Sequence, residues 1–200
     1  MTETTELWQL APTELAPTDD PTTRFLVEIE KVGGTTVRLT PAELVGEITA
    51  TLAGLGAHRV GLTADLGDAR SVIRQALTGA GFEVADYELI AGDREAVRML
   101  DATVTGCLAG VAATGSIVTG GAAGRAGALV APTHICVVEA RRIVDGLATL
   151  MRLAPRLGAG SMMALHTGPS RTADIEKTLI IGVHGPKRVH VVLLDGVLAP

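Results

Sequence analysis

Aromatic side chains are scarce in this sequence, which contains one tryptophan, one tyrosine and two phenylalanines among 200 residues. Hydrophobic residues still make up 47% of the chain, so its core must consist mainly of alanine, valine, leucine and isoleucine. So few rings do not provide the stacking platform on which many proteins hold single-stranded bases. The composition therefore indicates an aliphatic core, in a chain long enough to bury about 70% of its unfolded surface.

An excess of positive charge is also absent. The chain has 17 lysines and arginines against 22 aspartates and glutamates, which gives a net charge of −5 at pH 7. Electrostatic binding to nucleic acid or to anionic lipid requires a positive surface. We therefore expect neither nucleic acid nor a membrane surface as a partner.

Cysteines are limited to Cys107 and Cys136, which form no C-x-x-C pair. An iron–sulfur cluster takes several cysteine ligands, so this chain cannot hold one by itself, and the sequence contains no metal-binding motif and identifies no cofactor. Low cysteine usage is typical of the reducing cytoplasm, and Glu3 and Glu6 argue against a secretory signal peptide. We therefore expect a cytoplasmic protein without a metal site.

A membrane-spanning segment is not expected either. Residues 102–124 carry no charge and are long enough to cross a bilayer. Six glycines and five hydroxyl-bearing residues interrupt them, however. This composition is typical of buried strands and turns rather than of a helix in lipid.

Short apolar runs alternate with amphipathic helices along most of the chain. We expect strands at residues 36–39, 60–62, 82–85, 102–105, 116–118, 135–138, 162–165 and 189–194, and helices at residues 22–32, 40–55, 68–78, 93–100, 141–153 and 172–181. Because the strands are apolar throughout, they are typical of strands buried on both faces. The pattern predicts a Rossmann-like α/β fold with a mostly parallel sheet and helices on both faces, formed as one domain by residues 21–200 after a flexible arm at residues 1–20.

Three glycine-rich turns follow apolar runs, where ligands bind in parallel α/β sheets. The first turn brings Thr114, Gly115 and Ser116, which can offer hydroxyl and backbone N–H groups to an anion, although a tight turn between strands explains the same residues. The second, at residues 120–127, lacks the order of a dinucleotide or nucleotide motif. It predicts a mobile loop on which Arg125 either closes over an anion or lies in solvent.

The third turn, at residues 166–176, is expected to open a helix that Ser170 or Thr172 caps. The free N–H groups of a helix N-terminus and the guanidinium of Arg171 predict a site for a phosphate or a carboxylate. A structural role also fits, because Asp174 can pair with Arg171. Further on, His184 lies in a Gly-Pro turn as either a general acid or base or a hydrogen-bonded structural residue.

The motifs TGSIV (residues 114–118), PTHICVV (132–138), GPSRTADIE (168–176) and GVHGP (182–186) together resemble the LUD-domain family, and within it the lactate-utilisation protein C group. The resemblance covers most of the chain from about residue 101 onwards. It implies the fold of the sugar-phosphate isomerases and CoA transferases (the NagB/RpiA/CoA-transferase-like fold). It also implies a part in the oxidation of L-lactate to pyruvate beside iron–sulfur protein subunits.

The sequence departs from the family pattern at Cys107, Leu108 and Ala113, where acidic residues are common, so glutamyl acyl transfer is poorly supported. We hypothesise a non-iron–sulfur subunit of a lactate-oxidising system that binds a small anionic ligand at the strand carboxyl ends. The predicted ligand-binding residues are Thr114, Gly115, Ser116, Arg125, Ser170, Arg171 and Thr172, with His184 and Asp174 as catalytic candidates. The alternatives are a free-standing isomerase or CoA-transferase-like enzyme and a scaffold with a vestigial cleft.

Overall fold

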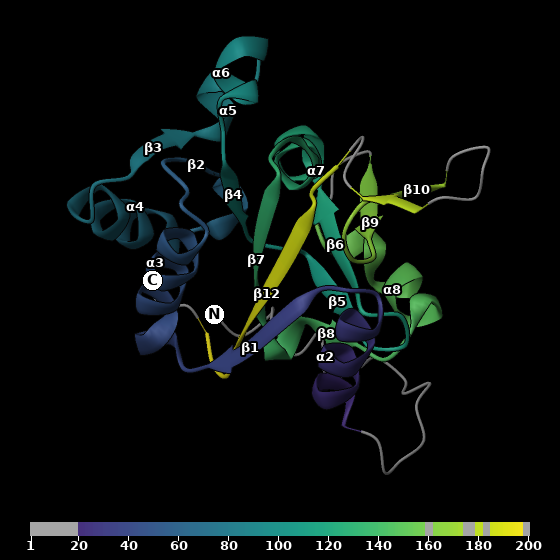
Figure 1. The fold of residues 1–200 in the computed structure, drawn as a ribbon. Coiled ribbons are helices and arrows are strands. Elements are labelled where there is room, and N and C mark those ends of the chain that lie inside the picture. The colour runs from purple at the N-terminus through teal and green to yellow at the C-terminus, as the bar shows by residue number, and fades with distance from the viewer. Residues whose placement is uncertain (1–19, 159–161, 174–178, 182–184, 198–200) are drawn as a thin grey trace.

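The structure is a computed structural model that describes residues 20–158, 162–173, 179–181 and 185–197 (Figure 1). Its centre is a sheet of six strands, all parallel, in the order β1-β12-β7-β4-β2-β3. These strands are β1 (Thr35–Leu39), β2 (Arg59–Leu62), β3 (Glu83–Asp86), β4 (Ala102–Thr105), β7 (Thr133–Glu139) and β12 (Arg188–Leu194). The predicted parallel α/β sheet is therefore confirmed.

Two helices, α3 (Leu44–Gly54) and α4 (Ala69–Gly79), cover one face of this sheet (Figure 1). Their apolar stripes include Ile48, Leu52 and Ile73, which pack on the strands in one cluster. As the sequence predicts, Thr40 and Glu43 form a capping box, and Pro41 begins a 3-10 turn, η1 (Pro41–Glu43), before α3.

The opposite face carries a second sheet and two helices. Its strands are ordered β8-β5-β6-β9, namely β8 (Ile143–Val144), β5 (Ala109–Val111), β6 (Ser116–Gly120) and β9 (Met163–His166). Helix α2 (Pro21–Lys31) and helix α7 (Gly121–Val130) flank it. Phe25 and Ile29 of α2 are fully buried in a cluster with Ile117 of β6 and Val191 of β12.

The remaining elements are short. They are η2 (Ala64–Leu66), α5 (Tyr87–Ile90), α6 (Arg94–Arg98), η3 (Ala140–Arg142), α8 (Leu147–Leu153), η4 (Ala154–Arg156), and the antiparallel strands β10 (Arg171–Ala173) and β11 (Leu179–Ile181). No helix in the described ranges has both the length and the hydrophobicity needed to cross a membrane.

Three sequence predictions are wrong. The helix predicted at residues 172–181 is instead the β10–β11 pair. The helix predicted at residues 141–153 forms only from Leu147, because the chain before it pairs as β8 with β5. The loop predicted at residues 120–127 is largely helix α7. For residues 143–144, pairing with the distant β5 overrides the local helical pattern.

Phe25 offers a test of how the second layer is held to the sheet. Its ring is fully buried, and a Cβ added to Gly110 of β5 would lie 3.0 Å from it. We expect Phe25→Ala to lower the free energy of unfolding by about 3–5 kcal/mol, because it leaves a cavity. Val27→Ala on the same helix is the control, since Val27 is 43% exposed and its loss should cost less than about 0.5 kcal/mol. Equal effects in urea denaturation would contradict this role of Phe25.

Candidate functional site

The order of the parallel strands identifies one edge of the sheet as the place for a ligand. After β2 the chain crosses through α4 on one face, whereas after β4 it enters the second sheet on the other face. Because β2 and β4 are neighbours, their carboxyl ends diverge and leave a crevice. Such a switch point is the usual ligand site of open α/β sheets.

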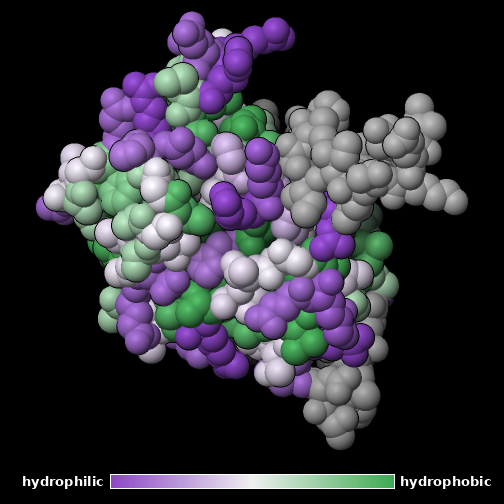
Figure 2. Space-filling model, viewed as in Figure 1, coloured by the Kyte–Doolittle hydropathy of each residue, from purple (hydrophilic) through white to green (hydrophobic). Residues whose placement is uncertain are grey.

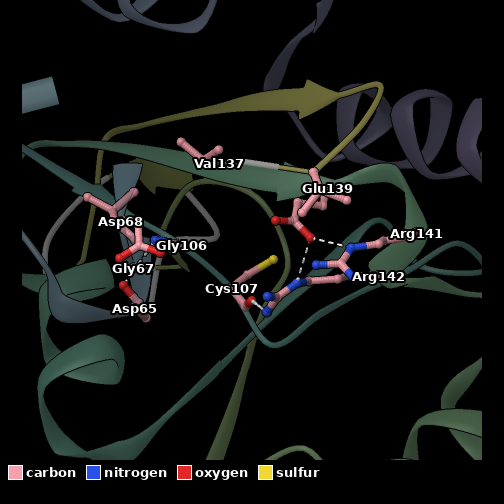
Figure 3. A pocket seen from close by; sticks show the side chains of 11 residues that line it. Asp65, Gly67, Asp68, Gly106, Cys107, Val137, Glu139, Arg141 and Arg142 are labelled. Carbon is pink, nitrogen blue, oxygen red and sulfur yellow. Dashed lines mark hydrogen bonds and ion pairs between the residues drawn. The ribbon is translucent and has the colours of Figure 1, made fainter. Parts of the chain in front are cut away.

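A cavity of about 180 Å³ lies at this switch point. Three turns supply its walls, one after each of β2, β4 and β7. The turns contribute Asp65, Leu66, Gly67 and Asp68 after β2, Gly106 and Cys107 after β4, and Arg141 and Arg142 after β7; Val137 and Glu139 of β7 itself and Val197 complete the lining. Figure 3 shows Asp65 and Asp68 on one side of this switch-point pocket, the two arginines on the other, and the Cys107 thiol between them.

Asp65 is one of three described acidic residues that line the pocket, with Asp68 and Glu139. Its Oδ1 accepts hydrogen bonds from the Gly106 N–H, at 3.0 Å, and from the Thr63 hydroxyl. Asp65 is exposed as a residue, but the protein atoms packed around its carboxyl raise the pKa of Asp65 by desolvation. The charge of Glu88 also raises this pKa, while the hydrogen bonds from Thr63 and Gly106 oppose the shift. A carboxyl whose pKa is raised holds its proton to a higher pH than a free aspartate does, which suits it to return a proton to a ligand.

Gly106 lets the turn after β4 approach the turn after β2. A Cβ at this position would lie 2.2 Å from the carbonyl oxygen of Asp65, which is far inside van der Waals contact. Any larger residue would separate the two turns and break the hydrogen bond that holds the Asp65 carboxylate.

The basic wall consists of two arginines around one buried carboxylate. Glu139 Oε2 accepts from Arg141 Nε at 2.7 Å and from Arg142 Nε at 3.2 Å. Arg142 Nη1 also donates to the carbonyl oxygen of Cys107 at 2.9 Å. Two guanidinium groups against one carboxylate leave a positive charge on this wall, which suits a carboxylate or phosphate ligand.

Cys107 lines the pocket, and Cys136 lies behind it. Both are free thiols and both are buried, Cys107 at 4% exposure. Burial, together with the neighbouring Cys107 thiol, raises the pKa of Cys136 well above its usual value. Cys136 therefore stays protonated, in agreement with its predicted role as a small buried hydrophobe.

The residues predicted from the first glycine-rich turn lie against α2. Thr114 and Ser116 hydrogen-bond through their hydroxyls at 2.7 Å, and Ser116 also bonds Thr167 at 2.7 Å. Gly115 has a φ of 62°, and a Cβ there would lie 2.3 Å from the Ile29 amide nitrogen. Gly115 thus serves the docking of α2, while ligand binding by Thr114 and Ser116 stays a prediction.

Ser170 and Arg171 lie next to the amino ends of the parallel strands. The Ser170 N–H donates to the Pro186 carbonyl at 2.9 Å, just before β12. Arg171 Nη2 donates to the carbonyl of Val32, at the C-terminal end of α2. The helix N-terminus that was expected to make an anion site here is a strand, so the described residues place Ser170 and Arg171 apart from the switch-point pocket.

Other predicted positions are less fully described. Arg125 lies in α7 and Thr172 in β10, where the backbone alone is described. Asp174 and His184 lie outside the described residues. Sequence reasoning missed Asp65, Arg141 and Arg142: Asp65 follows a strand of only four residues, and the arginines were assigned to a helix. Within the described part of the chain, no group of three or more His, Cys, Asp or Glu side chains could hold a metal ion.

Comparison with known proteins gives a family and a fold. A family model described as the LUD domain matches residues 22–194. "Lactate utilization protein C" of Deinococcus radiodurans is 35% identical over 98 residues, 47% of this chain and 46% of that protein. The protein of the same name from Bacillus pumilus is 31% identical over 126 residues, 58% of this chain and 52% of that protein. The chain thus spans about half the length of the curated relatives it matches.

A solved structure extends this likeness over nearly the whole fold. The crystal structure of a DUF162 family protein from Deinococcus radiodurans aligns with a TM-score of 0.65 and 25% sequence identity. The alignment covers 88% of this chain and 96% of that chain. The arrangement of the two sheets and their helices is therefore similar in both proteins.

The raised pKa of Asp65 predicts a pH-dependent stability difference. Because the folded protein holds this proton more tightly than the unfolded chain, the Asp65 contribution to stability falls as pH rises from about 4, the unfolded value, through the folded pKa. Asp65→Asn keeps an oxygen for Gly106 and Thr63 but does not titrate. We expect its stability relative to the wild type to increase between pH 4 and pH 7 in urea denaturation.

Asp68→Asn is the matched control, because Asp68 lines the same pocket. Its stability relative to the wild type should change less over this pH range. Stability curves of Asp65→Asn and the wild type that stay parallel from pH 4 to pH 7 would contradict the assignment of a raised pKa to Asp65.

Proposed function

Because the chain belongs to the LUD domain family, we propose that it acts in lactate utilisation as a cytoplasmic subunit without an iron–sulfur cluster. Its ligand is a small hydroxy- or keto-carboxylate, held in the switch-point pocket. The names of the two relatives support the metabolic role. The observation that carries the ligand assignment is the pair of walls, Arg141 and Arg142 opposite Asp65, at the carboxyl ends of β2, β4 and β7.

The size of the pocket and the two arginines of its basic wall support this class of ligand. Sites for drug-sized molecules usually exceed about 300 Å³, whereas this cavity has about 180 Å³. A ligand carboxylate would bind the guanidinium of Arg141 or Arg142. Its hydroxyl or carbonyl group would then face Asp65, whose carboxyl accepts or returns a proton.

Under this proposal a partner protein must accept the electrons that the oxidation releases. Oxidation of a hydroxy acid to a keto acid releases two electrons and two protons. Asp65 can take a proton, but the two cysteines of the chain are too few for an iron–sulfur cluster. Iron–sulfur subunits that accept the electrons are therefore the proposed partners.

A second anion site remains a proposal beside the first. Thr114, Ser116 and Ser170 with Arg171 offer hydroxyls and a guanidinium. The other predicted residues come from the same motif as Arg171 (Thr172 and Asp174), from the GVHGP motif (His184) and from the second glycine-rich turn (Arg125). The raised pKa of Asp65 also favours a free-standing acid–base enzyme of the isomerase type. Variants in each site and purification from cells distinguish these possibilities.

Arg141→Gln tests the ligand assignment. Titration calorimetry of the purified chain with L-lactate and with pyruvate should show binding that Arg141→Gln weakens by roughly 10- to 100-fold, the usual effect of losing a charged hydrogen bond. Arg38→Gln is the control, because Arg38 is an exposed arginine that pairs with Asp195. Arg171→Gln separates the two sites: loss of binding in this variant alone would move the ligand to the second site.

Purification of the tagged chain from its own cells at low salt tests the partner assignment. We expect cysteine-rich proteins with visible iron–sulfur absorption to elute with it. Recovery of the chain alone, also after cross-linking, together with turnover of a sugar phosphate or a CoA thioester by the isolated chain would overturn the subunit role. No binding and no turnover would leave a scaffold as the better description.

A further inference from the structure

The turn that carries Asp65 is a single 3-10 turn, η2. Its own backbone bonds run from the Leu66 N–H to Thr63 at 3.3 Å and from the Gly67 N–H to Ala64 at 3.0 Å. The Thr63 side chain does not cap the turn, and its hydroxyl donates to the Asp65 carboxylate instead. Because the first N–H groups of a helical turn have no partner within it, the Ala64 N–H needs an acceptor from elsewhere in the fold.

Glu88 of α5 supplies this acceptor. Its Oε1 accepts from the Ala64 N–H at 2.7 Å, although the two residues are 24 positions apart in the chain. Its other oxygen, Oε2, accepts from Arg70 Nη2 at 2.7 Å. Hydrogen bonds to an ionised carboxylate are shorter and stronger than those between neutral groups. Glu88 therefore ties η2 to α4, the helix that carries Arg70.

Arg70 is itself fixed by ion pairs. Asp86, at the end of β3, accepts from the guanidinium groups of Arg70 and of Arg74, one turn further along α4. The side chains are 24% exposed for Arg70 and 29% for Asp86 and Glu88. These pairs are therefore partly shielded from the water and salt that weaken surface ion pairs. Glu88 and Arg70 lie outside the described lining of the switch-point pocket, so they can act on it only through η2.

We propose that Glu88 is a positioning residue of the switch-point pocket, which holds η2 by the Ala64 N–H and so keeps the Asp65 carboxyl against the Gly106 N–H and opposite the arginine wall. Ala64 directly precedes Asp65, so a shift of the Ala64 amide moves the Asp65 backbone with it. Misplacement of a reacting group by about 1 Å can cost up to roughly 100-fold in rate. The use of this device rests on the proposed function, whereas the contact between Glu88 and Ala64 does not.

The negative charge of Glu88 has a second effect on the same group. It raises the pKa of Asp65, in addition to the larger effect of desolvation. Glu88 thus influences both where the Asp65 carboxyl lies and how tightly it holds a proton. A residue that only stabilised the fold would affect neither quantity selectively.

Amide exchange and amide resonances test the contact. We expect Glu88→Ala to speed hydrogen exchange of the Ala64 N–H by roughly tenfold, because its acceptor is lost. The Gly106 resonance should shift as well, since this N–H donates to Asp65. Glu88→Gln should largely restore both, because glutamine keeps an oxygen for Ala64. Backbone amides of β7 report any general loss of stability. Wild-type exchange at Ala64 and an unshifted Gly106 resonance in Glu88→Ala would overturn the proposal.

Glu83→Ala is the matched control. Glu83 begins β3, close to Glu88 in the chain, and it also pairs with one arginine, Arg59. Its described contact lies away from η2. The variant should leave Ala64 exchange and the Gly106 resonance as they are in the wild type. An effect equal to that of Glu88→Ala would show a general loss of negative charge rather than positioning, and would overturn the proposal.

Ala64→Pro removes the same contact from the donor side. Thr63 has φ −95° and ψ 155°, the extended conformation that a residue before proline adopts, and proline is favoured at the first position of a helical turn. The variant should move the Gly106 resonance as Glu88→Ala does. The two changes combined should not add, because both remove one contact. Additive shifts of the Gly106 resonance would overturn the role of the Ala64 N–H.

Calorimetry with L-lactate and pyruvate keeps this proposal apart from the proposed function. Glu88→Ala should weaken binding by roughly tenfold, the usual effect of losing one charge-assisted hydrogen bond, and Glu88→Gln should weaken it less. A wild-type chain that binds neither acid, with a Gly106 resonance that depends on Glu88, would overturn the proposed function and sustain the positioning of Asp65. Wild-type binding that Glu88→Ala leaves unchanged would sustain the proposed function and overturn the positioning role.

Discussion

The central strands of the parallel sheet are completely buried, and this burial determines how the other elements are arranged around them. Every residue of β7 and of β4 is buried, and so is most of β12. A strand buried on both faces requires a cover on each, because its backbone groups are satisfied by its neighbours but its side chains must leave water. Helices α3 and α4 provide one cover, while α2, α7 and the second sheet provide the other (Figure 1).

The cover formed by α2, α7 and the second sheet is packed with few aromatic rings. Phe25 is the large ring buried there, and small residues let the backbone of one layer approach the next. Gly115 meets the backbone of α2, and Gly127 of α7 lies close to Thr63 and Thr105. Close approach of this kind gives tight packing without large side chains. It also brings hydroxyl and imidazole groups into the interior, where they form hydrogen bonds with one another.

The layered arrangement decides where the polar groups of the molecule lie. The outer surface mixes hydrophilic and hydrophobic residues without one dominant apolar face in the view of Figure 2. Glu139, Arg141 and Arg142, which are partly or fully withdrawn from water, cluster at the carboxyl edge, where the more exposed Asp65 faces them. The pocket therefore results from the strand order, which brings the turns after β2, β4 and β7 together at the carboxyl edge of the sheet.

Much of the parallel sheet and of its α3/α4 cover could be predicted from the sequence, because local signals mark them. Thr40, Pro41 and Glu43 cap a helix by their own side chains, and residues 135–138 are apolar without interruption. The β10–β11 pair and β8 were not predictable in this way. Residues 172–181 and 141–153 carry helix-like patterns. The ends of the first segment pair with each other as β10 and β11, and Ile143–Val144 in the second pairs as β8 with the distant β5, while α8 forms only from Leu147.

The candidate site likewise has features that the sequence predicts and features that it does not. An aliphatic core, a parallel sheet and glycine-rich turns after its strands could all be predicted from the sequence, because composition and periodicity are properties of neighbouring residues. The tertiary structure alone decided that Asp65, Gly106 and Arg141 share one pocket while Arg171 lies at the end of α2. Those contacts join residues far apart in the chain, and strand order, which no local pattern encodes, brings them together.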